Sequence, residues 1–187
     1  MSEDKTKILV QSSWAKVLPD VNDKSQVEKV GVLLFKRIFE LAPGARELFS
    51  FADSKEETPR GMVVHGAKVI QTVDTAVKML DEPDKLIPVL QRLGKAHVGY
   101  GVVEAHYPVV GAALLWALEQ ALGPAWTAET KTAWTNIYDL IATTMIEASG
   151  GSSQPKSKQE SPKPRFGGVV LIGIAAIAFG VISSSFR

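Results

Sequence analysis

The chain has 187 residues, of which 21 are Lys or Arg and 20 are Asp or Glu, so its formal net charge is +1. This balance argues against a nucleic-acid-binding protein, which would carry a strong basic excess. The sequence has no cysteine, which excludes disulfides, thiolate nucleophiles and zinc–thiolate or iron–sulfur sites. Imidazole chemistry depends on three residues: His65, His97 and His106.

The first 149 residues show helical periodicity throughout and no convincing alternation of the kind that predicts strands. Pro43 can open a short helix, Asp84 and Thr127 are expected to cap helices, and Gly123–Pro124 is a firm stop signal. Residues 49–57 are polar and irregular. The pattern therefore predicts a single all-α domain over 1–149, with about seven helices at 8–17, 27–41, 43–49, 59–80, 84–97, 104–122 and 127–148.

Charge divides the chain into two regions. Residues 1–149 contain 16 Lys and Arg against 19 Asp and Glu, a net charge of −3, whereas residues 150–187 contain 5 against 1, a net charge of +4. Residues 150–165 (GGSSQPKSKQESPKPR) are rich in Ser, Pro, Gly and Lys and have no apolar side chain to bury. This composition predicts a disordered basic linker behind a mildly acidic domain.

A charge-free segment follows the linker at Phe166–Ile182 (FGGVVLIGIAAIAFGVI). As a helix it is ~25 Å long, slightly under the ~30 Å hydrocarbon core of a bilayer, and Ser183–Phe186 bring it close to spanning. The alternative is a buried helix of a soluble core, but such a helix would show a polar face. The sequence thus predicts a single transmembrane helix over 166–186 that contacts membrane lipid as a tail anchor.

The flank before this segment carries Lys156, Lys158, Lys163 and Arg165. By the positive-inside rule, that flank and the domain attached to it are expected to face the cytoplasm. A short, moderately hydrophobic anchor suits a thin, sterol-poor membrane, so the mitochondrial outer membrane is the first expectation.

Two of the histidines lie on neighbouring predicted helices. His65 is within the helix 59–80, and His97 is at the end of the next helix. Two imidazoles placed in this way can face each other across a gap that a planar cofactor could fill. Iron in such a cofactor needs an axial nitrogen, which neutral imidazole supplies.

The other candidate residues would complete the walls of that gap. A cationic Lys68 at the rim would suit cofactor carboxylates. An apolar wall would shield iron from water and hold the cofactor by burial; its candidates are Phe35, Phe49, Val69, Leu90, Val102, Tyr107 and Val110.

On these residues, and on several longer segments in the same order, the sequence resembles a globin over about residues 5–149. The HGAKV block and the segment 122–141 are most similar to neuroglobin-like globins, whereas AHYPVVG is more like bacterial single-domain globins. The segments that carry the resemblance are LVQSSWAKV (9–17), LLFKRIFELAPGARELF (33–49), HGAKV (65–69), LGKAHVGYGV (93–102), EAHYPVVG (104–111) and LGPAWTAETKTAWTNIYDLI (122–141).

The resemblance implies a globin fold around a non-covalently bound haem b. His97 matches the proximal iron ligand and His65 the distal histidine, which in neuroglobin-like globins also binds the iron in the absence of gas. Phe49 matches the phenylalanine that packs on the haem face, and Phe35 stands where many bacterial globins have a tyrosine. A six-coordinate resting state is implied in this way. Spacing alone leaves open whether His65 binds iron or only hydrogen-bonds to a bound ligand.

The roles of three further residues follow from the same comparison. Val69 is expected to line the distal pocket, and Lys68 to contact a haem propionate. His106 starts a helix away from the iron-facing positions, so it is expected to be structural or exposed at the surface.

Several functions are compatible with this pattern. The first is reversible binding of O2, CO or NO, which requires nothing beyond this chain. The second is enzymatic, NO dioxygenation or nitrite reduction, with electrons from a membrane-bound reductase because the chain has no residues left for a reductase domain. The third is electron transfer or redox sensing, and the fourth is a haem-free helical scaffold.

Overall fold

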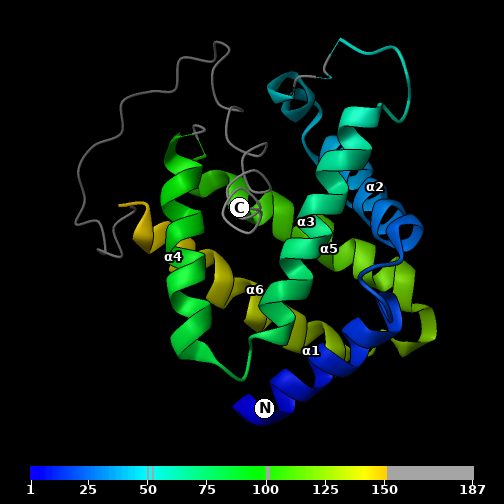
Figure 1. Cartoon of the computed structure of the whole chain (residues 1–187). Helices are drawn as coiled ribbons and strands as arrows, with labels where there is room; N and C mark the ends of the chain where they lie inside the picture. The colour runs from blue at the N-terminus through cyan, green and yellow to red at the C-terminus, as the bar shows by residue number, and fades with distance from the viewer. Residues whose placement is uncertain (50, 52, 100–101, 151–187) are drawn as a thin grey trace.

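The computed structural model describes residues 1–49, 51, 53–99 and 102–150 of the chain. Over these residues the fold is entirely helical, as predicted for the domain 1–149 (Figure 1). The predicted linker 150–165, apart from Gly150, and the predicted anchor 166–186 lie outside the described residues. The elements in chain order are α1 (Glu3–Val17), α2 (Lys24–Leu41), η1 (Pro43–Leu48), α3 (Arg60–Lys78), α4 (Pro83–Gly99), η2 (Glu104–His106), α5 (Tyr107–Leu122), η3 (Gly123–Ala125) and α6 (Ala128–Ala148), where η marks a 3-10 helix.

Local side-chain chemistry accounts for several helix ends. The Thr127 hydroxyl accepts a hydrogen bond from the Thr130 N–H at 3.2 Å, which caps α6 as predicted. Pro43 opens η1, also as predicted. The helix α5 ends at Leu122, and Gly123 follows with a φ of 51°, a left-handed conformation that glycine adopts without steric cost.

Other helix boundaries differ from the prediction. The helix α4 begins at Pro83, so Asp84 lies in its first turn instead of capping it; the Glu82 carbonyl accepts the first hydrogen bond, from the Leu86 N–H at 2.9 Å. The predicted helix 104–122 is divided into η2 and α5. Pro108 in the first turn of α5 has no N–H to donate, which favours a new helix start at that point.

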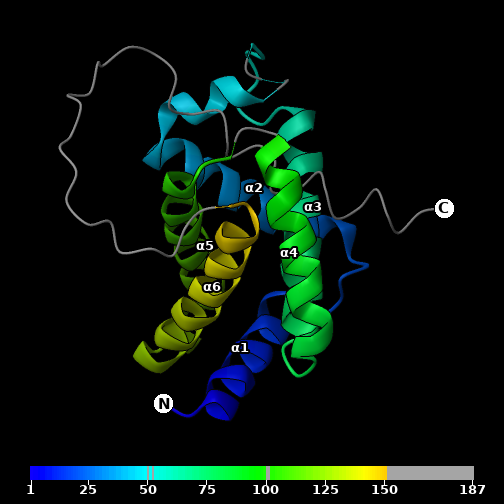
Figure 2. The ribbon, with the colours of Figure 1, turned by 90° about the vertical axis from the view of Figure 1, so that its left-hand side faces the viewer.

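Two glycines bring α2 and α3 into backbone contact. A Cβ atom on Gly66 would lie 2.6 Å from the carbonyl carbon of Gly31, and a Cβ on Gly31 would be closer still to the Gly66 carbonyl carbon. The two helices lie side by side in Figures 1 and 2. This crossing sets the position of His65 on α3 relative to Phe35 on α2.

A similar approach joins α4 to α6. A Cβ atom on Gly94 would collide with the backbone of Met145, so the two helices can cross at this distance only because position 94 has no side chain. Gly94 lies one turn before His97 on α4. The depth of His97 in the fold is therefore set by the contact between α4 and α6.

Two tryptophans tie α1 to α3 and α6. The indole rings of Trp14 and Trp134 lie 5.7 Å apart between centroids. The Trp14 indole N–H donates to the buried Asp74 carboxylate at 3.1 Å, and the Trp134 indole N–H donates to the Ser13 hydroxyl at 2.9 Å. Both buried donors are thus satisfied, which leaves the large rings free to fill the core without an unpaired polar atom.

Within the described part of the chain, no single helix has both the length and the hydropathy to cross a membrane. Taken together, the bent helix pair Pro83–Gly99 and Glu104–Ala125 meets the criterion for a membrane span, by length and composition only.

The glycine contact between α2 and α3 generates a stability prediction. A Gly66→Ala substitution forces the helices apart, at a cost of roughly 1–3 kcal/mol for overpacking. For a domain of this size we expect the melting temperature, measured by far-ultraviolet circular dichroism, to fall by roughly 2–12 °C. Gly99→Ala is the matched control, since an added Cβ there meets no described atom within 4 Å. Equal melting temperatures for the two variants would contradict this packing.

Candidate functional site

His97 has an unusual environment in the last part of α4. Its side chain is fully buried, and its Nδ1 lies 2.7 Å from the Leu93 carbonyl oxygen. Because a carbonyl can only accept, Nδ1 carries the hydrogen and Nε2 carries a lone pair. Nε2 is buried and has no hydrogen-bond partner among the described residues. Burial lowers the pKa of His97 to about 4, against a smaller opposing effect of the Leu93 hydrogen bond, so the ring is neutral near pH 7.

An apolar cavity lies beside this part of α4. Its volume is about 80 Å3, and it is enclosed by side chains from five helices. Leu93, the residue that accepts the His97 hydrogen bond, is one of them. Four of the predicted wall residues line this cavity: Val69, Leu90, Tyr107 and Val110.

His65 belongs to a cluster of aromatic rings next to α2. Its imidazole meets the Phe35 ring edge-on, with centroids 5.6 Å apart, and meets the Phe49 ring edge-on at 5.5 Å. The two phenylalanine rings also contact each other at 5.4 Å. His65 precedes Val69 by one turn of α3, so the ring cluster and the cavity share a helix face.

The remaining residues considered in the sequence analysis are Lys68, Val102 and His106, and none of them lines the cavity. Lys68 is half-buried on α3, and nothing in the described residues tests its role at a carboxylate. Val102 is half-buried and packs against the core, but it is not among the residues that line the cavity; its N–H donates to the His97 carbonyl at 3.1 Å. His106 is buried, and its Nδ1 accepts from the Val103 N–H at 3.2 Å, which is a structural role as predicted.

Residues of α6 form a wall of the cavity that the sequence analysis did not assign to the site. They recur every three or four positions, the spacing of one helix face, so the periodicity of 127–148 contained the signal. Because these residues are far in sequence from both His65 and His97, the pattern did not assign them to the site. The α6 residues in the wall are Trp134, Ile137, Tyr138, Ile141, Ala142 and Met145.

Two tyrosines join α5 to α6 at this wall. The Tyr138 hydroxyl donates to the Tyr107 carbonyl oxygen at 2.6 Å. Burial raises the pKa of Tyr107 to about 12 and also raises the pKa of Tyr138, so both phenols stay neutral. The wall therefore brings no charge to the cavity.

The arrangement fits a metal that arrives with most of its own ligands. Among the described residues, no group of three or more His, Cys, Asp or Glu could hold a bare metal ion. One buried, neutral imidazole nitrogen, Nε2 of His97, is present instead. His97 does not itself line the apolar cavity, but Leu90 and Leu93 on the same helix do. A buried nitrogen without a partner costs roughly 1–3 kcal/mol, which an axial bond to the iron of an apolar macrocycle would offset. The residues therefore fit a haem group.

Comparisons with known proteins agree with this chemistry. The sequence matches the family model described as Globin over residues 32–145. It is 31% identical over 159 residues to neuroglobin of Danio rerio, an alignment that covers 82% of this chain and 96% of the relative. It is 34% identical over 145 residues to anaerobic nitrite reductase AHB2 of Arabidopsis thaliana, covering 74% and 88% respectively.

One solved structure has a similar fold. It is a crystal structure of a hexacoordinated heme protein from an anhydrobiotic tardigrade, which superposes with a TM-score of 0.68. The alignment covers 80% of this chain and 96% of the tardigrade chain, at 19% sequence identity. At this identity the similarity concerns the fold.

The lowered pKa of His97 predicts a pH dependence for the cofactor-free protein. Between pH 6.5 and about 4 the unfolded chain binds a proton on this ring that the folded chain does not. The free energy of unfolding therefore falls as the pH drops through that window, by up to about 1.4 kcal/mol per pH unit. Urea unfolding at several pH values should show this dependence in the wild type and lose it in His97→Leu. Parallel curves for the two proteins would contradict the neutral buried ring.

Proposed function

The chain belongs to the globin family, and on that premise we propose that it is a haem b protein that binds a diatomic gas. His97 is the proximal iron ligand in this proposal, and His65 is the sixth ligand at rest. When bound, haem would supply an iron at which O2, CO or NO could bind in exchange for a side chain. Everything else is supplied by residues of the chain.

The observation that carries the proposal is the unpartnered Nε2 atom of His97. Three features select this nitrogen as a donor to iron: its neutrality, the hydrogen on Nδ1 and its burial without a hydrogen-bond partner in the described residues. The Leu93 carbonyl fixes the orientation of the ring and, by accepting the Nδ1–H, makes Nε2 a better donor. His97 thus has its ring orientation and its tautomer set before any cofactor binds.

The distal side of the pocket supports a role for His65 as a reversible ligand. Its ring is held edge-on between Phe35 and Phe49, and both phenylalanines are buried. Val69, one turn further on, lines the cavity. Neither phenylalanine can donate a hydrogen bond, so His65 is the distal group that can either bind iron or stabilise a bound gas. Lys68, half-buried on the same turn, would contact a propionate.

The test of this proposal is spectroscopic. When the wild-type full-length protein is titrated with haem, it should take up one haem per chain. Its ferrous visible spectrum should then show sharp, split low-spin bands. His65→Leu should show a broad five-coordinate ferrous spectrum. If the six-coordinate form makes up about nine-tenths of the wild type, the apparent CO affinity of His65→Leu should be about tenfold higher.

His106→Leu is the matched control for that experiment, because His106 is the other histidine outside the proximal position. Its ferrous spectrum should match that of the wild type. A wild type that takes up haem but stays five-coordinate would remove His65 as an iron ligand. A wild type that takes up no haem would contradict the proposal as a whole.

Nitrite reduction is a second candidate function, favoured by the similarity to plant anaerobic nitrite reductases at 32–34% identity. Nitrite takes up one electron and two protons and yields NO and water, so turnover requires a one-electron donor. With dithionite as donor under argon, haem-loaded chain should release NO from nitrite, and His65→Leu should be faster because the competing side chain is gone. The absence of NO in both proteins would exclude this activity.

We also propose that residues 166–186 anchor the protein in a membrane, with the globin domain on the cytoplasmic side and the mitochondrial outer membrane as the first candidate. The charge-free run Phe166–Ile182 and the basic flank before it support this assignment. The globin domain would then lie near the electron donors of that surface.

Carbonate extraction of cells that express the full chain tests the anchor. The wild type should stay in the membrane pellet. Ile174→Lys with Ile177→Lys adds roughly 2.5–3.5 kcal/mol of insertion cost per lysine and should move the protein to the supernatant. Ile174→Leu with Ile177→Leu is the control that keeps the segment apolar. Release of the wild type itself would contradict the proposal.

A further inference from the structure

Beyond the rings that touch His65, the aromatic cluster continues to Phe51. The Phe51 ring is buried and stacks on Phe49, with centroids 4.9 Å apart and an interplanar angle of 28°. Phe39 on α2 packs edge-on against both rings, at 5.5 Å from Phe49 and 6.3 Å from Phe51. Phe51 therefore contacts Phe49, the ring that in turn contacts His65.

Phe51 also lies against the backbone of α3 at Gly61. A Cβ atom placed on Gly61 would be 2.6 Å from Cδ1 of the Phe51 ring and 3.2 Å from its Cβ. Gly61 and His65 are four residues apart, so they share one face of α3. The chain of contacts Gly61–Phe51–Phe49–His65 thus begins and ends on the same helix, and the two phenylalanines fill the space between.

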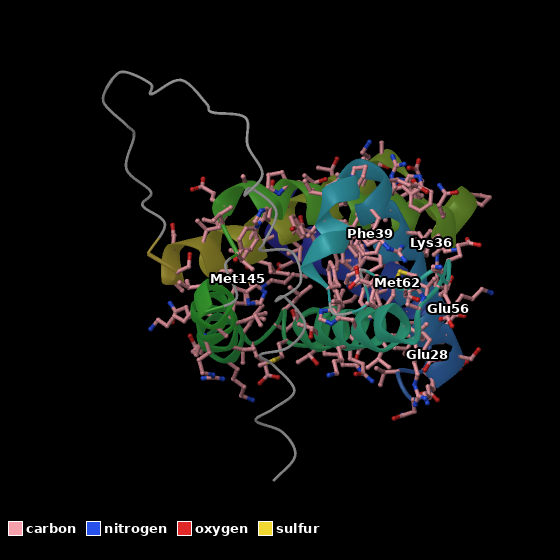
Figure 3. The ribbon with its side chains drawn as sticks, turned by 90° about the horizontal axis from the view of Figure 1, so that it is seen from above. Glu28, Lys36, Phe39, Glu56, Met62 and Met145 are labelled. Atoms are coloured by element: carbon pink, nitrogen blue, oxygen red, sulfur yellow. The ribbon has the colours of Figure 1, made fainter. Side chains whose placement is uncertain are left out.

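Polar contacts hold residues 54–57, which follow Phe51 in the chain. Lys36 on α2 forms an ion pair of 2.5 Å with Glu57, and Arg46 donates to the carbonyl oxygens of Ser54 and Glu56, both at 3.2 Å. The Arg46 guanidinium also lies over the Phe39 ring, 5.9 Å from its centroid. In Figure 3, Lys36, Phe39 and Glu56 lie at the same end of the molecule, away from Met145. These contacts join Ser54, Glu56 and Glu57 to α2 and η1.

We propose that Phe51 is a positioning residue for His65: wedged between Gly61 and Phe49, it fixes the imidazole in the orientation that reaches the iron. The inference rests on the proposed function. It adds that Phe51 sets the equilibrium between His65 bound to the iron and His65 displaced from it. Without the Phe51 ring, Phe49 gains room to tilt, and the His65 side chain becomes more mobile. Binding the iron then costs more conformational entropy, because it must fix that side chain again. A gas competes with His65 for one site, so this equilibrium also sets the apparent gas affinity.

Two substitutions disturb the wedge from opposite sides. Phe51→Leu removes the stacked ring, and Gly61→Ala pushes that ring by placing a methyl group where its Cδ1 lies. In full-length haem-loaded protein we expect each to lower the ferrous equilibrium constant for His65 ligation roughly three- to tenfold, the range that the loss of one aromatic contact supports. The constant is obtained from the low-spin fraction of the visible spectrum and from CO rebinding after flash photolysis.

Gly61→Ala separates positioning from general stability. Position 61 is an exposed helical position, and Ala is intrinsically the better helix former there. A merely structural role for Phe51 would leave the low-spin fraction of this variant unchanged. Phe51→Tyr keeps the stacked ring and should restore the wild-type constant. Leu86→Ala removes a buried side chain near the start of α4, far along that helix from His97, and should lower the melting temperature without moving the constant.

The outcomes distinguish this inference from the function on which it rests. A six-coordinate wild type with an unchanged constant in Phe51→Leu and Gly61→Ala would overturn the positioning role and leave the proposed function intact. An equal shift in Leu86→Ala would also overturn it, because destabilisation alone would then suffice. A wild type without a low-spin band would overturn the proposed function and this inference together.

Discussion

The site depends first on the hydrogen bond from His97 Nδ1 to the Leu93 carbonyl oxygen. It places the hydrogen on one ring nitrogen and leaves the other with a lone pair, so it decides which atom can bind iron. Burial then keeps the ring neutral, because water is absent to stabilise the imidazolium. Acceptor and ring lie one helical turn apart on α4, so helix geometry itself holds the tautomer.

The rest of the fold positions the helices that carry His97 and His65. The contact of Gly94 with Met145 sets α4 against α6, and the contact of Gly31 with Gly66 sets α3 against α2. Backbones in direct contact have little freedom to slide, since close-packed atoms leave no room. The proximal and distal helices are therefore held by stiff crossings. The segment between η1 and α3 is instead held by side chains, through the stacked rings of the Phe49 region and an ion pair. In the proposed function, this difference in stiffness would favour a displaceable ligand on the His65 side and a fixed ligand on the His97 side.

Much of the fold and part of the candidate site could be predicted from the sequence, because the signals that specify them are local. Helical periodicity and caps such as Thr127 are local, and they placed most helices correctly. The start of α4 was wrong by two residues, since a helix capped by Asp84 would begin at Lys85 and α4 begins at Pro83. Pro83 and Asp84 are both good first-turn residues, and the competition between them is not visible in a pattern. The α6 wall was missed because it depends on how distant helices cross. Val102 was expected in the pocket wall, but its side chain packs against the core without lining the cavity. Its N–H donates to the His97 carbonyl, a backbone contact that side-chain character does not reveal.

The central claim is that His97 Nε2 is the nitrogen that holds haem, and a cavity variant tests it most directly. His97→Gly removes the imidazole and leaves a space of matching shape. Haem titration of this variant, with and without added imidazole, should show weak uptake alone and recovery of one haem per chain, with the wild-type ferrous spectrum, when imidazole is present. Wild-type uptake and spectrum in His97→Gly without imidazole would contradict the account, because the proximal bond would then come from another residue.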